Sequence, residues 1–153
     1  MKAKTIALTI SLFFASVAMG FQNNPQMGTW KLNEGKSKLA GKAKNHTVVY
    51  EAAGDQIKVT VDGVDENGAA VHNEWTGKFD GKDYPVTGDA NSDVRSYRMI
   101  NKNTLSLSGK KNGKVTLSGR IVVSRDGKTR TVTTTTTNAQ GKKVMNTAVY
   151  DKQ

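Results

Sequence analysis

Residues 112–142 read NGKVTLSGRIVVSRDGKTRTVTTTTTNAQGK, and this stretch decides the fold. Apolar and polar side chains alternate along it with a period of two residues, which is typical of a β-strand with one buried face. Turn pairs interrupt the alternation at Asn112-Gly113, Asp126-Gly127 and Gln140-Gly141, which are spaced 14 residues apart. One strand and one tight turn fill each interval. The stretch therefore predicts a meander of long hairpins.

The same alternation continues over the rest of the chain after residue 20. Ile57, Val59 and Val61, for example, alternate with polar residues, and Asn67-Gly68 marks the next turn. Long strands joined only by hairpins leave exposed edges unless the sheet closes on itself. We therefore predict one all-β domain over residues 21–153, an antiparallel up-and-down β-barrel of about eight to ten strands with no substantial helix. A β-sandwich is the alternative, although its crossing connections usually need longer loops.

Turn positions also predict which side chains share a face, because directly paired residues point to the same side of a sheet. A two-residue turn at Asp126-Gly127 pairs Val123 with Arg130, and so places Arg130 on the apolar face. The same reasoning at Gln140-Gly141 predicts three further pairs: Arg130 with Asp151, Thr134 with Thr147, and Thr136 with Met145. The inner threonines either provide hydroxyls to a ligand in a hydrated cavity or pack their methyl groups in the core.

The first twenty residues form a separate unit. Lys2 and Lys4 precede an apolar run over residues 6–14, and small residues follow up to Gly20. This order is typical of a secretory signal peptide, and the run is shorter than the roughly 20 residues that a membrane-spanning helix needs. We expect residues 1–20 to be removed on export, leaving a periplasmic or secreted protein without a membrane span. An outer-membrane barrel is a weaker alternative, because the aromatic girdles of that class are missing.

Charge is unevenly distributed along the 153 residues, which carry a formal net charge of +10 and no Cys. Residues 21–93 have 8 basic and 11 acidic side chains, whereas residues 94–153 have 13 basic and only 2 acidic ones. Successive turns of a meander alternate between the two ends of a barrel. We therefore expect one basic rim at Lys110, Lys111, Lys114, Lys142 and Lys143, and another at Lys102, Arg125 and Lys128.

Motifs for catalysis are absent from the sequence. It contains no Gly-x-Ser-x-Gly elbow, no phosphate-binding loop and no His-Glu-x-x-His motif. His46 and His72 have no carboxylate at metal-ligand spacing, and the lack of Cys excludes thiolate sites. We therefore predict a protein that is not an enzyme and uses no cofactor or metal.

Gly28-Thr29-Trp30-Lys31-Leu32, which opens the first expected strand, resembles the Gly-x-Trp start of lipocalins and fatty-acid-binding proteins. These calycin families are antiparallel barrels around a small-molecule site. The resemblance implies that Trp30 closes one end of the barrel, and that Ala148-Val149-Tyr150 lies where fatty-acid-binding proteins have Arg-x-Tyr. Here Ala148 replaces the carboxylate-binding arginine, and residues 33–45 are too few for the two-helix lid. The wider chain resembles small secreted bacterial proteins.

Together these features predict an exported, monomeric binding protein that holds a small amphiphilic, hydrophobic or anionic ligand inside the barrel. Its candidate ligand-binding residues are Trp30, Trp75, Arg130, Thr134, Thr136 and Thr147. The alternative is an interaction module that binds an anionic polymer or protein through the basic rims. Specific nucleic-acid binding is not expected, because aromatic residues are not interleaved with the lysines.

Overall fold

The protein is described by a computed structural model that covers residues 23–138 and 140–153. These residues form a closed barrel in which each strand pairs with its neighbours in the chain and the first strand pairs with the last. The strands are β1 (Gly28–Leu32), β2 (Lys44–Ala53), β3 (Gln56–Val64), β4 (Ala70–Gly77), β5 (Tyr84–Thr87), β6 (Val94–Asn101), β7 (Thr104–Lys111), β8 (Lys114–Val123), β9 (Thr129–Thr137) and β10 (Lys143–Lys152).

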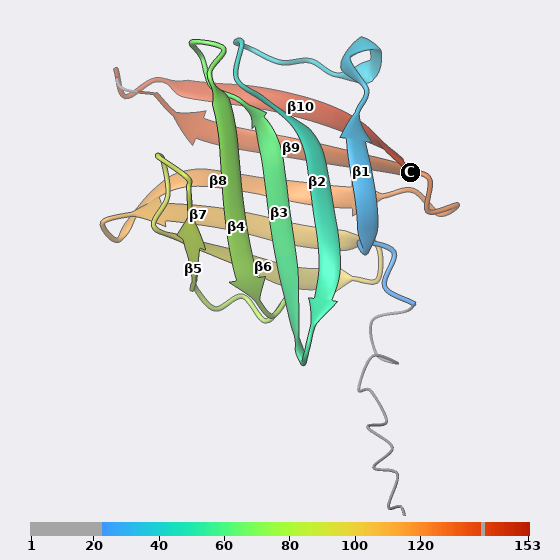
Figure 1. Cartoon of the computed structure of the whole chain (residues 1–153). Coiled ribbons are helices and arrows are strands. Elements are labelled where there is room, and N and C mark those ends of the chain that lie inside the picture. The colour runs from blue at the N-terminus through green and yellow to red at the C-terminus, as the bar shows by residue number, and fades with distance from the viewer. Residues whose placement is uncertain (1–22, 139) are drawn as a thin grey trace, which may run out of the picture.

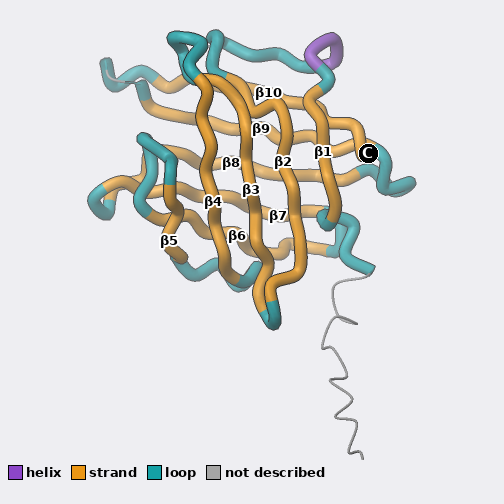
Figure 2. Tube along the Cα trace, viewed as in Figure 1, coloured by secondary structure: helices purple, strands orange, loops and turns teal. Residues whose placement is uncertain are grey.

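The predicted all-β up-and-down barrel is confirmed. Within these ranges the helical content is one 3-10 turn, η2 (Glu34–Lys36), after β1 (Figure 2). No helix in this part of the chain is long and apolar enough to cross a membrane. The predicted signal peptide lies outside the described residues.

The two halves of the sequence form two opposite walls of the barrel. Strands β1–β4 run upright in Figure 1, and β6–β10 run across them behind. The first wall belongs to the part of the chain with a slight acidic excess, and the second to the part with 13 basic and 2 acidic residues. The charge asymmetry of the sequence therefore becomes an asymmetry between two faces.

The predicted register between β8 and β9 is confirmed. Val123 pairs with Arg130 and Gly119 with Thr134. Four residues lie between Ser124 and Thr129, whose backbones are hydrogen-bonded. Because this number is even, like that of the predicted two-residue turn, each β9 side chain points to the predicted face.

The predicted register between β9 and β10 is wrong by one residue. Arg130 pairs with Tyr150, and Thr134 pairs with Asn146 rather than Thr147. The Asn138 carboxamide oxygen accepts hydrogen bonds from the amides of residues 140 and 142, so three residues separate Asn138 from Lys142. An odd number of loop residues turns every β10 side chain to the opposite face. Asp151 and Met145 therefore pair with Thr129 and Thr135, on the outer face.

A segment before β1 closes one end of the barrel, here called the Gln26 end. Gln26 is fully buried, and its side-chain amide donates to the Asn103 carbonyl oxygen in the β6–β7 turn. The Trp30 indole donates to the Gln26 carbonyl oxygen over 2.9 Å. The opposite end, where the β7–β8 and β9–β10 turns lie, is called the Lys142 end.

Burial of the inner side chains changes along the barrel. Towards the Gln26 end, Trp30, Val59 and Ile121 are all at most 1% exposed. Towards the Lys142 end, the inner face of β8–β10 keeps partial solvent access. Seven half-buried side chains make up this region, which we call the inner strip: Leu117, Val132, Thr134, Thr136, Val144, Asn146 and Ala148.

Candidate functional site

Arg130 lies in the barrel interior, with only 3% of its surface exposed. Strand β9 directs it inward because its partner Val123 belongs to the buried face of β8. The guanidinium carbon lies 4.6 Å from the Tyr50 ring centroid, 5.6 Å from that of Tyr150 and 5.9 Å from that of Trp30. A cation surrounded by ring faces gains electrostatic stabilisation from each of them.

Arg130 has no anionic partner among the residues that the structure describes. One terminal nitrogen donates to the Tyr50 hydroxyl over 2.5 Å, but Nε and Nη1 are buried without a hydrogen-bond acceptor. Burial raises the pKa of the Tyr50 phenol far above its usual range, despite the opposing effect of the Arg130 charge, so Tyr50 provides no phenolate. The predicted pairing with Asp151 is wrong, because Asp151 lies outside and contacts Asn33 and Lys36.

A second buried arginine, in contrast, has a carboxylate partner. Arg95 on β6 forms a salt bridge of 2.8 Å with Asp89, and both guanidinium termini donate to the Asn73 carboxamide oxygen. The two side chains of the salt bridge are 8% and 15% exposed. Arg95 is therefore balanced by a carboxylate, whereas Arg130 leaves one positive charge in the interior.

Aromatic rings connect Arg130 to an opening near the Gln26 end. Tyr50 packs edge-on against Phe79 and Tyr97, and Trp75 stacks on Phe79 with 6.5 Å between centroids. Phe79 borders a cavity of about 270 Å³. The other residues that line it are Asn24, Asp55, Ile57, Gly77, Lys78 and Met99. The cavity is slightly smaller than a typical small-molecule site and adjoins apolar rings.

The predicted ligand residues do not all meet at one place. Trp30 and Arg130 are in contact, and Trp75 belongs to the adjoining aromatic cluster, where its indole donates to the Arg95 carbonyl oxygen. Thr134 and Thr136 lie on the inner strip, as predicted. Thr147 was predicted to lie with Thr134, and this placement is wrong, because the β10 register puts Thr147 on the outer face opposite Thr133.

Sequence reasoning missed Tyr50 and Tyr150 as neighbours of the buried cation, and Phe79 as a neighbour of Tyr50. Tyr50 lies 80 residues from Arg130 along the chain, and barrel closure brings them together. The alternation of β2, in which Val48 and Tyr50 share a parity, was the available signal for an inward tyrosine.

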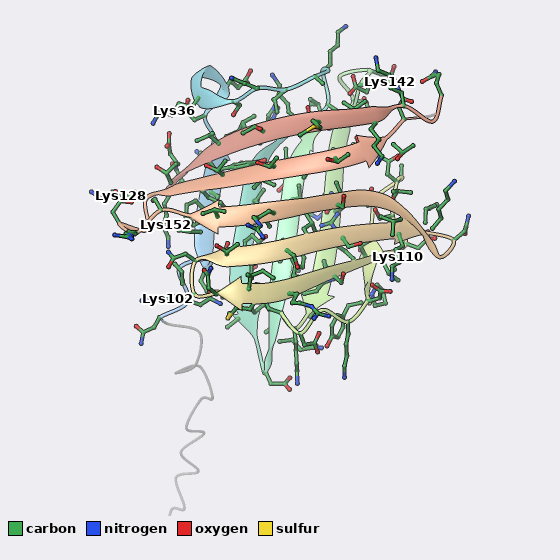
Figure 3. The ribbon with its side chains drawn as sticks, turned by 180° about the vertical axis from the view of Figure 1, so that it is seen from behind. Lys36, Lys102, Lys110, Lys128, Lys142 and Lys152 are labelled. Atoms are coloured by element: carbon green, nitrogen blue, oxygen red, sulfur yellow. The ribbon has the colours of Figure 1, made fainter. Side chains whose placement is uncertain are left out.

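The lysines of the two predicted basic rims lie at opposite ends of the barrel. Lys110 and Lys142 are at one end, and Lys102 and Lys128 at the other (Figure 3). Lys110 forms a salt bridge of 2.6 Å with Asp83, and Lys111 forms one of 2.9 Å with Asp93. The rim near Lys142 is therefore partly neutralised on its β7 side.

A second pocket, of about 490 Å³, lies outside the barrel between the loop after β1 and the β3–β4 connection. Glu34, Leu39, Lys44 and Val64 contribute to its lining. Two of its charged side chains, Glu34 and Lys44, form a salt bridge of 2.8 Å with each other.

His72 lies on the outer face between two carboxylates, and it provides a test of the β3–β4 register. Its Nδ1 lies 2.6 Å from Asp62 and its Nε2 lies 3.3 Å from Glu74, and these hydrogen bonds raise the pKa of His72 above its ordinary value of 6.5. A raised pKa stabilises the fold below pH 6.5, and this contribution is lost as the pH rises through the folded-state value. We expect an NMR titration of His72 to show the raised pKa. The pKa should return towards 6.5 in Asp62→Asn/Glu74→Gln, and an identical titration in that variant would contradict the register.

Comparison with known proteins identifies no family for the chain. No protein-family model matches it, and no curated protein does. A solved structure similar to it is that of a redesigned β-barrel, mFAP1, bound to DFHBI, with a TM-score of 0.49 and 13% sequence identity. The match covers 85% of this chain and 99% of that one.

Proposed function

We propose that the protein is a binding protein that takes a small anionic amphiphile into its barrel, with Arg130 as the partner of the anionic group. The observation that carries this proposal is the buried guanidinium of Arg130, whose Nε and Nη1 have no acceptor and which forms no salt bridge within the described residues. Removal of a charge from water costs several kcal/mol unless a partner compensates for it. A carboxylate, sulfonate or phosphate monoester would supply that compensation.

The apolar part of the ligand would pack against the aromatic cluster. The 270 Å³ cavity gives access to Phe79, whose ring adjoins Tyr50, and Tyr50 in turn contacts Arg130. Both unpaired nitrogens of Arg130 are buried, so Phe79 and Tyr50 must move aside for the anionic group to reach them. Rings that pack edge-on can make such a movement without breaking a backbone hydrogen bond.

The proposal includes export and a role without catalysis. The order of charges and apolar residues over residues 1–20 supports removal of a signal peptide and function in a periplasm or medium. A calycin-like carrier needs a buried binding group and an apolar interior, and it needs no nucleophile or general base. Both requirements agree with the composition of the interior around Arg130.

Paired fluorescent probes test the role of charge directly. Anilinonaphthalenesulfonate and phenylnaphthylamine share an aromatic body, but only the first is an anion. We expect the protein to bind the sulfonate more tightly, and Arg130→Met to weaken sulfonate binding by at least about 30-fold, since loss of a buried charge partner costs about 2–5 kcal/mol. Binding of the neutral probe should change little.

Arg130→Lys is the matched control, because it keeps a charge without the fork of donors. It should recover part of the sulfonate affinity. Mass spectrometry of the protein under native conditions after export would also reveal a co-purified anion. Equal affinity of the two probes for the natural protein, unchanged by Arg130→Met, would contradict the proposal.

A further inference from the structure

A group of exposed cations and apolar side chains lies at the Lys142 end, at the start of β8, at the start of β10 and in the turn between β9 and β10. We define this cationic edge patch by five residues: Lys114, Val115, Lys142, Lys143 and Met145. On β10, Lys143 pairs with Thr137 and Met145 pairs with Thr135 of β9. On β8, Val115 pairs with Lys110 of β7. The patch therefore flanks the last residues of β9, at the end of the barrel that carries Lys142 in Figure 3.

The charges of this patch are not neutralised within the described part of the chain. None of its three lysines forms a salt bridge there, in contrast to Lys110 and Lys111 nearby. The wall from β6 to β10 contains only two carboxylates, Asp126 and Asp151. Asp126 lies in the β8–β9 turn and Asp151 pairs with Thr129, so both are at the opposite end.

The patch also contains the two most exposed large apolar side chains in the described structure. Met145 is 67% exposed and Val115 is 51% exposed. They lie on the two strands that neighbour β9, Val115 on β8 and Met145 on β10. An exposed apolar side chain among unpaired lysines is amphipathic in the way that interfacial membrane-binding surfaces are.

We propose that the cationic edge patch docks the barrel onto a bilayer that contains anionic lipid. Lysines at such a surface gain attraction from the lipid headgroups, and apolar tips gain from burial at the acyl boundary. An anionic polymer would satisfy the lysines but would leave Met145 and Val115 in water, and the patch has no aromatic ring on which bases could stack. The lipid surface therefore explains both components. This docking does not depend on the interior site at Arg130.

Vesicle sedimentation tests the docking. The chain that begins at residue 21 retains all strands of the barrel and avoids the apolar segment over residues 6–14, which would itself enter lipid. We expect binding to vesicles of equal parts phosphatidylglycerol and phosphatidylcholine, and little binding to phosphatidylcholine alone. Lys114→Gln/Lys142→Gln/Lys143→Gln should weaken binding roughly 100-fold. Val115→Ser/Met145→Ser should weaken it about tenfold while keeping the charge.

A matched control removes the same charge from the other end. Lys102→Gln/Arg125→Gln/Lys128→Gln should change vesicle binding by less than about threefold, because these cations lie beyond the screening length of roughly 8 Å from the docked face. The chain contains no Cys, so Met145→Cys accepts a polarity-sensitive label at one site. The label should report an apolar environment on anionic vesicles only, and a label at Met99→Cys should not.

Three results would overturn the docking proposal. Equal losses in the two triple variants would indicate general charge attraction instead of a patch. Retention on heparin that depends on the three lysines, with vesicle binding unaffected by Val115→Ser/Met145→Ser, would identify an anionic polymer as the partner. The absence of any binding to anionic vesicles would also exclude docking onto lipid. Lys114→Gln/Lys142→Gln/Lys143→Gln should still bind anilinonaphthalenesulfonate. Failure of the docking proposal and failure of the Arg130 proposal are therefore distinguishable.

Discussion

Arg130→Met is expected to raise the free energy of unfolding by about 1–4 kcal/mol while it removes anion binding. Arg130 is 3% exposed and has no carboxylate partner in the described residues, so the free protein carries the cost of a buried unpaired charge. Met fills a similar volume and packs against the Tyr50 and Trp30 rings, although the hydrogen bond to the Tyr50 hydroxyl is lost. Urea denaturation followed by circular dichroism measures the change.

The same substitution at Arg95 should act in the opposite direction. Arg95→Met leaves the Asp89 carboxylate without its guanidinium, and we expect a loss of about 3–5 kcal/mol. A pair of identical substitutions therefore separates an unpaired buried cation from a paired one. If Arg130→Met destabilises the ligand-free protein as much as Arg95→Met does, Arg130 has a structural counter-charge and the binding proposal loses its basis.

Much of the barrel could be predicted because its local signals agree. The period of two residues, the Asn-Gly and Asp-Gly turns and the lack of long crossings all favour a closed meander. The β8–β9 register also followed, since the loop between Ser124 and Thr129 has an even number of residues. The inward direction of Arg130 depends on that parity alone, so the order of residues around the turn is enough to predict it.

The β9–β10 register failed for a local reason. The Gln140-Gly141 pair suggested a two-residue turn. In the structure, Asn138 begins the turn and Gly141, with a φ of 75°, ends it. Asn at the start and Gly in the left-handed region are typical of a three-residue hairpin loop, and that pattern was readable in the sequence. The error moved Thr147 and Asp151 to the wrong face and created a false partner for Arg130.

The surroundings of Arg130 could not be predicted from local patterns. Tyr50, Trp30 and Tyr150 come from β2, β1 and β10, and their meeting depends on closure and on how the two walls cross. Parity assigns each ring to the inside, but it does not determine the depth at which each ring lies. The absence of a counter-ion in the described residues is likewise a property of the assembled interior.

Trp30→Ala should lower the free energy of unfolding by about 3–5 kcal/mol, as much as Arg95→Met. Trp30 is fully buried, and its indole holds the Gln26 segment across the end of the barrel. Trp30→Phe keeps most of the ring volume but not the indole hydrogen bond, so a smaller loss of about 1–2 kcal/mol is expected. Urea denaturation measures both, with Trp75 as the remaining fluorophore.

The exposed Met145→Ala serves as the reference for Trp30→Ala and should remain within about 0.5 kcal/mol of the natural protein. Which of the two Trp30 variants loses more stability matters as much as the size of each loss. Trp30→Ala opens a void beside Gln26, whose side-chain amide then loses the packing that keeps it near Asn103. Limited proteolysis should therefore cut the segment before Gly28 faster in Trp30→Ala than in Trp30→Phe. Equal rates in the two variants and the natural protein would mean that the Gln26 segment is held by other contacts, and that Trp30 does not close the barrel.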